Sequence, residues 1–186
     1  DGRGIGHGQL LEGVLHGGGG GPHLAGVLAV QRDLERAAAA QHDVVAVARD
    51  ELVLIAPSAG EYLRWKDPVP LEEVLRAPML CREPGSGTQK TFDDALRRLG
   101  VDAERITARA QLDSVEAIKS AVADGGGVAV ISDLAMRGDP AAQSVRILHI
   151  EGLSLVRSFY LITHMRRVLS PAAQAFRDFA VSSLAP

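Results

Sequence analysis

Residues 78–99 read PMLCREPGSGTQKTFDDALRRL, which is a short apolar run, a turn rich in glycine and serine, and an amphipathic segment in succession. The apolar run Pro78–Arg82 predicts a short buried strand. Beyond the turn, apolar residues recur at helical spacing, at Phe92, Ala95, Leu96 and Leu99. This period predicts an amphipathic helix over Gln89–Leu99 that ends at Gly100. The stretch is therefore expected to form a strand–turn–helix unit.

A second unit of the same kind follows. Ile106–Ala110 is expected to be extended, and either Asp113 or Ser114 is expected to cap a helix. That helix would bury Val115, Ile118 and Val122 and end at the three glycines 125–127. Val128–Ile131 is entirely apolar, as expected of a strand in a parallel sheet that is covered on both faces.

Further strands and helices are predicted on both sides of these units. The other expected strands are Val44–Val47, Glu51–Ala56 (ended by Pro57), Val145–Ile150 and Leu155–Thr163. Helices are expected at Pro70–Leu75 and after Ser170-Pro171, the latter with Phe176, Phe179 and Leu184 on its inner side. Near the start of the chain, Leu10–Leu15 favours a helical turn, Leu24–Val30 a strand or a helix start, and Arg32–Ala40 a helix. Alternating strands and helices predict an α/β fold with a largely parallel sheet.

Composition excludes several classes of protein. The chain has 186 residues, of which 46% are hydrophobic and 23% charged, as in a soluble globular protein of one domain or two small lobes. No apolar run reaches the roughly 18–20 residues of a membrane span, and the first residues lack the pattern of a signal peptide. A single cysteine excludes an internal disulfide, and a net charge of −3 with 4% aromatic residues disfavours nucleic-acid binding by this chain itself.

Neither a nucleotide cofactor nor a metal is predicted. The chain contains no glycine followed by Lys and then Ser or Thr, as a P-loop requires, and no G-x-G-x-x-G. Four histidines, at positions 7, 16, 23 and 42, fit no standard ligand spacing. His149 and His164 lie in predicted strands, where structural or surface roles are expected.

Catalysis has equally little support, and no enzymatic activity is expected. Cys81 lies on a predicted buried strand, where an inert thiol is expected. Ser86 lies in Gly-Ser-Gly, which lacks the five-residue pattern of a nucleophile elbow. The acid pairs 72–73 and 93–94 are adjacent on predicted helices and therefore do not face each other.

Three loops could together bind a small anion. Ser86, Gly87 and Thr88 precede one helix, where backbone N–H groups and hydroxyls suit a carboxylate, sulfate or phosphate. Asp113 and Ser114 start a second helix, and Ser132 follows the apolar strand at its carboxyl end. The alternative is a set of capped turns without any ligand, and the local sequence leaves both interpretations open.

From about Arg49 to Leu184 the chain resembles the effector-binding domain of LysR-type transcriptional regulators. Four segments carry the resemblance, in order: Arg49–Pro57 (RDELVLIAP), Arg82–Thr88 (REPGSGT), Ser114–Ala123 (SVEAIKSAVA) and Val128–Ser132 (VAVIS). The resemblance implies a two-lobed fold, like that of type II periplasmic binding proteins. On that scheme residues 1–57 are a partial first lobe with an atypical stretch at 18–42, residues 58–152 are the second lobe, and residues 153–186 return to the first.

The resemblance also implies a function. In this family a small metabolite, often an anion, binds between the lobes and alters how a tetramer binds DNA. Ser86, Gly87 and Thr88 match the contact loop of the second lobe, and Asp113 and Ser114 match a helix start that borders the cleft. The expected partners are a small-molecule effector and further copies of the chain, with dimerisation through the first lobes. DNA would be bound only through an N-terminal helix-turn-helix that these residues do not include, and a cytoplasmic location without membrane contact is expected.

Two other functions share this fold. The solute-binding component of an importer would need an export signal, which the first residues do not show. An enzyme such as a dehydratase of amino-acid biosynthesis would need an acid or nucleophile in the cleft, where the loops offer only Ser, Thr and Asp113. Neither accounts for the ordered set of matching segments as well as a regulator does.

Overall fold

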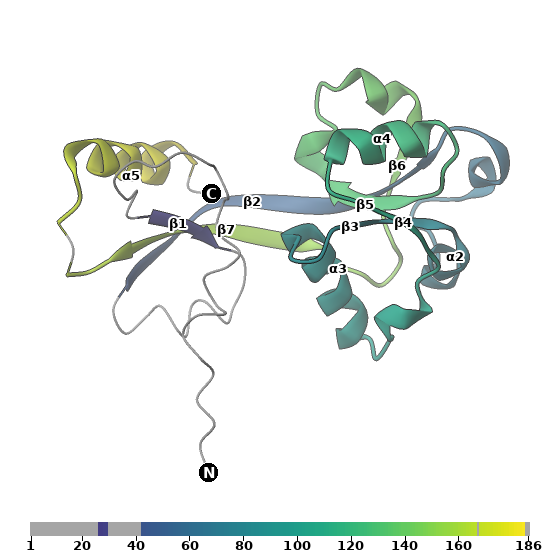
Figure 1. The fold of residues 1–186 in the computed structure, drawn as a ribbon, viewed down its shortest axis with the longest axis horizontal. Coiled ribbons are helices and arrows are strands. Elements are labelled where there is room, and N and C mark those ends of the chain that lie inside the picture. The colour runs from purple at the N-terminus through teal and green to yellow at the C-terminus, as the bar shows by residue number, and fades with distance from the viewer. Residues whose placement is uncertain (1–25, 30–41, 167, 185–186) are drawn as a thin grey trace, which may run out of the picture. The chain divides into compact units, whose positions relative to one another are not determined.

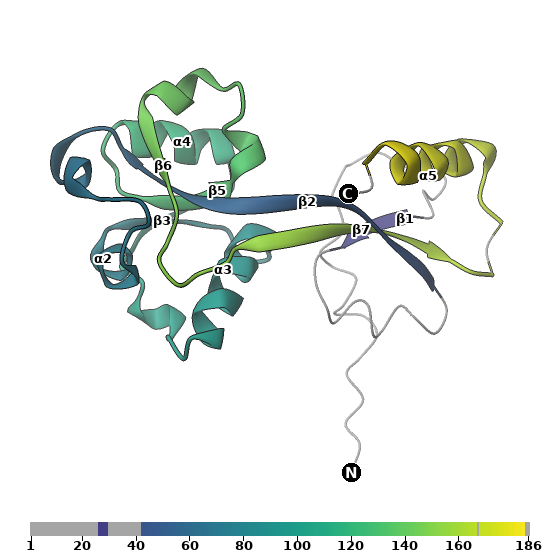
Figure 2. The same ribbon diagram turned by 180° about the vertical axis from the view of Figure 1, so that it is seen from behind.

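The computed structural model describes residues 26–29, 42–166 and 168–184, which form two compact units. The first unit contains the described residues up to Arg49 and those from Arg157 onward, and the second is Asp50–Val156. The chain therefore passes between units inside one strand, β2 (His42–Pro57), and at the start of another, β7 (Val156–His164). The sequence predicted these two boundaries after residues 57 and 152, whereas the units divide after residues 49 and 156. The helices and strands of each unit are labelled in Figure 1, and Figure 2 shows the same ribbon from behind.

The second unit is built on a mixed sheet. Strands β3 (Met79–Arg82) and β4 (Ala108–Leu112) are parallel, and a parallel bridge from Met79 to Val128 joins β3 to the start of β5 (Ala129–Ser132). Strand β2 is antiparallel both to β5 and to β6 (Val145–Leu148). Because β3, β4 and β5 run in the same direction, their carboxyl ends lie at one edge of this sheet.

The α/β class predicted from the sequence is confirmed, but two of its details are wrong. The sheet is mixed, with parallel pairing confined to β3, β4 and β5 among the described strands. The two strands expected at Val44–Val47 and Glu51–Ala56 are one continuous strand. The residues between them, Ala48, Arg49 and Asp50, include neither glycine nor proline, so nothing in the backbone forces a turn there.

Two helices cover opposite faces of this sheet (Figures 1 and 2). Side chains alternate along β2, so Leu52 and Leu54 lie in one buried cluster and Val53 and Ile55 in another. Helix α3 (Gly87–Arg98) adds Phe92, Ala95 and Leu96 to the first cluster, and α4 (Val115–Ala123) adds Ile118 and Val122 to the second. A short helix, α2 (Leu71–Arg76), also packs into the first cluster. The helical periodicity of the sequence thus predicted these buried residues of both long helices, but it was wrong for Leu99, which lies just after α3 and is 50% exposed.

In the first unit, β7 lies between β1 (Gly26–Ala29) and β2 and is antiparallel to β1. Helix α5 (Pro171–Leu184) packs through Ala180 in a cluster with Val47 and Leu161. The prediction that Phe176 and Phe179 lie on the inner side of this helix is wrong, since they are 53% and 59% exposed. The residue of α5 that packs in this cluster is the small Ala180, which is 2% exposed.

Other expectations fall partly or wholly outside the described residues. These are the helical segments at 10–15 and 32–40, most of the segment 24–30 and the side chain of Leu184. Among the residues that are described, no helix is long and apolar enough to cross a membrane.

Candidate functional site

The three loops singled out in the sequence lie at one edge of the sheet in the second unit. Ser86 follows β3, Asp113 and Ser114 follow β4, and Ser132 is the last residue of β5. The parallel direction of these strands places all three loops at their carboxyl ends.

The first loop is a tight turn that leads into α3. Gly85 has a φ of +89°, a conformation that side chains disfavour, and the Ser86 N–H donates to the carbonyl oxygen of Glu83 at 3.1 Å. Ser86 is the N-cap of α3, and its hydroxyl accepts a long hydrogen bond of 3.5 Å from the N–H of Gln89. Ser86 and Thr88 are both buried at 7% exposure. The helix thus begins at Gly87, two residues before the start expected from apolar periodicity.

The second loop begins α4. The sequence left Asp113 and Ser114 as alternative caps, and the structure assigns the role to Ser114, whose hydroxyl accepts from the N–H of Ala117 at 3.3 Å. Both residues are exposed to solvent. The loop therefore presents a helix start, with its partial positive charge, at an open surface.

Arg82, a residue that the sequence analysis did not assign to the site, links these two loops through hydrogen bonds to Glu83 and Asp113. Its guanidinium donates from Nε and Nη2 to the two carboxylate oxygens of Glu83, at 2.7 and 2.9 Å. Nη2 also donates to the backbone carbonyl of Asp113 at 3.4 Å. A charged residue at the end of an apolar strand, directly before a glycine-rich turn, is the signal that could have identified it.

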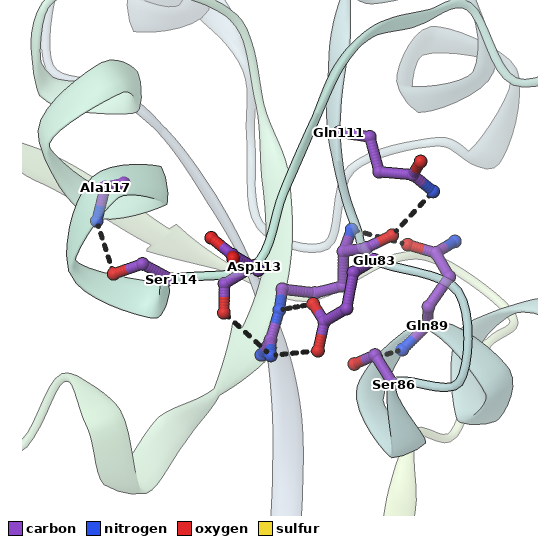
Figure 3. Close-up of polar contacts among 8 residues, drawn as sticks. Glu83, Ser86, Gln89, Gln111, Asp113, Ser114 and Ala117 are labelled. Carbon is purple, nitrogen blue, oxygen red and sulfur yellow. Dashed lines mark hydrogen bonds and ion pairs between the residues drawn. The ribbon is translucent and has the colours of Figure 1, made fainter.

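Two glutamines hold the backbone of Arg82. Its N–H donates to Oε1 of Gln89 at 3.0 Å, and its carbonyl oxygen accepts from Nε2 of Gln111 at 3.1 Å (Figure 3). The hydrogen bond from Arg82 is also the main reason that the pKa of the Glu83 carboxyl is below its ordinary value. Glu83 is therefore ionised at neutral pH, and the ion pair of Arg82 and Glu83 has no net charge.

The third loop makes a different contact. The hydroxyl of Ser132 donates to Oδ1 of Asp50 at 2.7 Å, and Asp50 on β2 is only 4% exposed. Arg82 thus brings the first two loops into contact, whereas Ser132 contacts Asp50, the first residue of the second unit. Asp50 was missed as a polar partner because it fell between the two strands predicted from the sequence, beside the charged residues Arg49 and Glu51, where a solvent-exposed position is expected.

A surface hollow of about 470 Å³ lies beside this region and is lined by Cys81, Arg82, Gln89, Asp93, Ala103, Ile106, Ala108, Arg109, Ala110 and Gln111. None of the six predicted site residues lines it. Burial raises the pKa of the Cys81 thiol, and Asp93 raises it further, so this cysteine stays a neutral thiol at physiological pH.

Within the described ranges, no group of three or more His, Cys, Asp or Glu side chains could hold a metal ion. His149 instead forms an exposed pair with Asp67, with Nδ1 at 3.0 and 3.2 Å from the two carboxylate oxygens. His42 and His164 pack edge to face in the first unit, with ring centroids 5.0 Å apart.

Comparison with known proteins agrees with this architecture. The sequence pattern of the LysR substrate binding domain matches residues 28–185. An uncharacterised HTH-type transcriptional regulator of Mycobacterium bovis is 36% identical over 135 residues, which are 72% of this chain and 43% of that protein. A protein of Anaeromyxobacter dehalogenans named as a phosphonates import ATP-binding protein, PhnC, is 35% identical over 140 residues, which are 75% of this chain and 28% of that protein.

Among solved structures, the regulatory domain of CcmR from Synechocystis PCC6803, in complex with 2-PG, superimposes with a TM-score of 0.71 and 25% identity. The match covers 86% of this chain and 73% of that one. The chain spans less than half the length of both curated relatives.

Proposed function

The chain belongs to the family of LysR substrate-binding domains, and on this premise we propose that it is the ligand-sensing part of a LysR-type transcriptional regulator. The match of that family over residues 28–185 carries the proposal. Binding of a small effector would favour one arrangement of the domain over another, and only such a difference in affinity can alter how the whole regulator binds DNA.

The proposed effector is a small anion, held at the loops of Ser86, Gly87, Thr88, Asp113, Ser114 and Ser132. Support comes from the starts of α3 and α4, whose backbone N–H groups and partial positive charges favour carboxylates, sulfates and phosphates. The contact of Arg82 with Asp113 places a cationic side chain between these two helix starts. The CcmR regulatory domain, a structural relative, was solved in complex with 2-PG, and small-molecule binding by this chain is proposed by likeness to it.

A regulatory role is favoured over the two rivals that share the fold. Neither an importer component nor an enzyme is what the family match indicates, since the family is one of regulatory domains. The name of the Anaeromyxobacter relative points to ATP binding, but this chain covers only 28% of that protein and contains no P-loop. Absence of catalysis in this domain is part of the proposal.

The remaining properties concern the whole regulator. In the complete protein, DNA would be bound by a helix-turn-helix outside these 186 residues, and copies of the domain would pair into dimers and tetramers. The two compact units would be the two lobes of the fold. The regulator would act in the cytoplasm without a membrane partner.

The anion site is tested by titrating the chain with sulfate, inorganic phosphate and 2-PG in a calorimeter, at constant ionic strength. Ser86→Ala and Thr88→Ala should weaken binding of whichever anion binds the wild type, by roughly three- to tenfold for one lost hydrogen bond. The matched control is Ser170→Ala, which removes the N-cap hydroxyl of α5 in the first unit, a bond of 3.3 Å to the N–H of Ala173. Unchanged affinity in both site variants would overturn the proposed location of the site.

A further inference from the structure

The guanidinium of Arg82 contacts Glu83, in the turn before α3, and the backbone carbonyl of Asp113, in the loop before α4. Its side chain is 16% exposed, its backbone is held by Gln89 and Gln111, and Nη2 is anchored on the carbonyl of Asp113. Because the backbone of Arg82 is held and its side chain is largely buried, its guanidinium has less freedom to move than the more exposed carboxylate beside it.

The edge of the guanidinium that is best suited to binding an anion is already occupied by a carboxylate. Nε and Nη2 form the parallel fork that binds a carboxylate through two hydrogen bonds, and the carboxylate in that fork is Glu83, the next residue in the chain. Glu83 lies in the turn that continues through Pro84 and Gly85, and its side chain is 35% exposed. It can thus leave the fork and be hydrated by water with far less cost than Arg82 could.

We propose that Arg82 is the cationic contact for the ligand and that Glu83 is its internal counter-ion, which a ligand carboxylate, sulfate or phosphate must displace in order to bind. This inference rests on the proposed function, because it assumes that an anion binds at these loops. It adds a residue from outside the predicted set and a competition that sets the affinity of the site. Neutral ligands, which gain nothing from Arg82, could not displace Glu83.

Competition predicts opposite effects for two substitutions. Glu83→Gln keeps the shape of the side chain but removes its charge, so an incoming anion meets a guanidinium without an ionic partner. Sulfate should then bind roughly tenfold more tightly than to the wild type, a size that allows for the partial exposure of the pair. Arg82→Gln removes the cation and should weaken sulfate binding at least as much.

The chain contains a matched control. Arg105 donates two hydrogen bonds from Nη2 to Glu72, at 3.0 and 2.9 Å, in the same unit, and both side chains are about half exposed. Glu72→Gln therefore frees an arginine from a carboxylate without touching the loops of the site. Sulfate affinity in this variant should stay within about twofold of the wild type, because two hydrated partners gain little from each other.

The experiment is a calorimetric titration of the four proteins with sodium sulfate at pH 7, with ionic strength held constant by chloride and folding checked by circular dichroism. Tighter sulfate binding in Glu83→Gln, without such a gain in Glu72→Gln, supports the proposal, even where the wild type shows no measurable affinity. Equal affinity in the wild type and Glu83→Gln overturns it, and so does a gain of equal size in Glu72→Gln. A wild type that binds an anion through Ser86 and Thr88, with no response to either residue of the pair, would leave the proposed function standing and remove this inference alone. If Glu83→Gln does not fold, Arg82→Gln decides: retained sulfate binding in that variant overturns the proposal.

Discussion

Lys119 offers a demanding test of how the second unit is held together. It lies on α4 with only 3% of its side chain exposed, and its ammonium contacts two carboxylates, those of Asp139 and of Glu116, the latter at 2.8 Å. It also donates to the backbone carbonyl of Ala135 at 3.3 Å. The contacts with Asp139 and Ala135 tie α4, which has Ser114 as its N-cap, to the segment that follows Ser132.

Lys119→Met retains the buried methylene chain and removes the charge. Removal of one partner from a fully buried ion pair costs about 3–5 kcal/mol, because the other charge is left without compensation. Here Asp139 keeps 22% and Glu116 78% of its side chain in solvent, so water can replace much of the lost contact. The expected loss in the free energy of unfolding is therefore about 2 kcal/mol, most of it from Asp139 and the carbonyl of Ala135.

The measurement is urea unfolding followed by tryptophan fluorescence, since Trp65 is the single tryptophan of the chain and is buried in the second unit. Lys90→Met is the control: its ion pair with Asp94 is on the surface, with 64% of Lys90 exposed, and should cost less than about 0.5 kcal/mol. The double variant Lys119→Met, Asp139→Asn should recover part of the loss. Equal losses in Lys119→Met and Lys90→Met would refute the argument that burial makes the Lys119 contact strong.

Two further predictions concern other parts of the second unit. The hydrogen bond to Asp67 raises the pKa of His149 above its ordinary value of 6.5, so the stability from this pair is complete below pH 6.5 and is lost as the pH rises through the raised pKa. The difference in unfolding free energy between the wild type and His149→Asn should shrink between pH 6 and pH 8.5, and a constant difference would contradict the assignment. Gly127→Ala should prevent stable folding, since an added Cβ would lie 2.2 Å from the carbonyl oxygen of Pro78. Gly125→Ala, which meets nothing within 4 Å, should cost only about 1 kcal/mol of backbone strain, and similar melting temperatures for the two variants would disprove the steric argument.

Sequence patterns identified α3, α4 and β5 to within two residues at each end, because each depends on signals that lie close together in the chain. Apolar spacing marked the buried side of α3, and the Ser114 hydroxyl is within three residues of the N–H that it caps. Gly85 and Ser86 of the turn before α3 were likewise visible, since turn chemistry is local. The expected alternation of strands and helices then fixed the α/β class.

Strand β2 shows where this reasoning failed. Its sequence predicted two strands, but β2 is a single strand that pairs with β5 and β6 through residues 52–57 and also lies beside β7. These partner strands follow much later in the chain, so local sequence does not show them. The exposure of Phe176 and Phe179 was missed for a similar reason: a helical period shows which residues share a face, but the strands that α5 packs against decide which face is buried.

The sequence by itself therefore determined the local elements, the helix caps and the loops that could bind an anion. Only the tertiary structure decided which groups distant in the chain meet in the second unit: Arg82 with the carbonyl of Asp113, Ser132 with Asp50, and Lys119 with Asp139. These partners are separated by 31, 82 and 20 residues. Hydrogen bonds within a turn or cap depend on a few neighbouring dihedral angles, whereas contacts at such separations form only after the sheet has brought distant segments together, at a cost in chain entropy that local sequence does not encode.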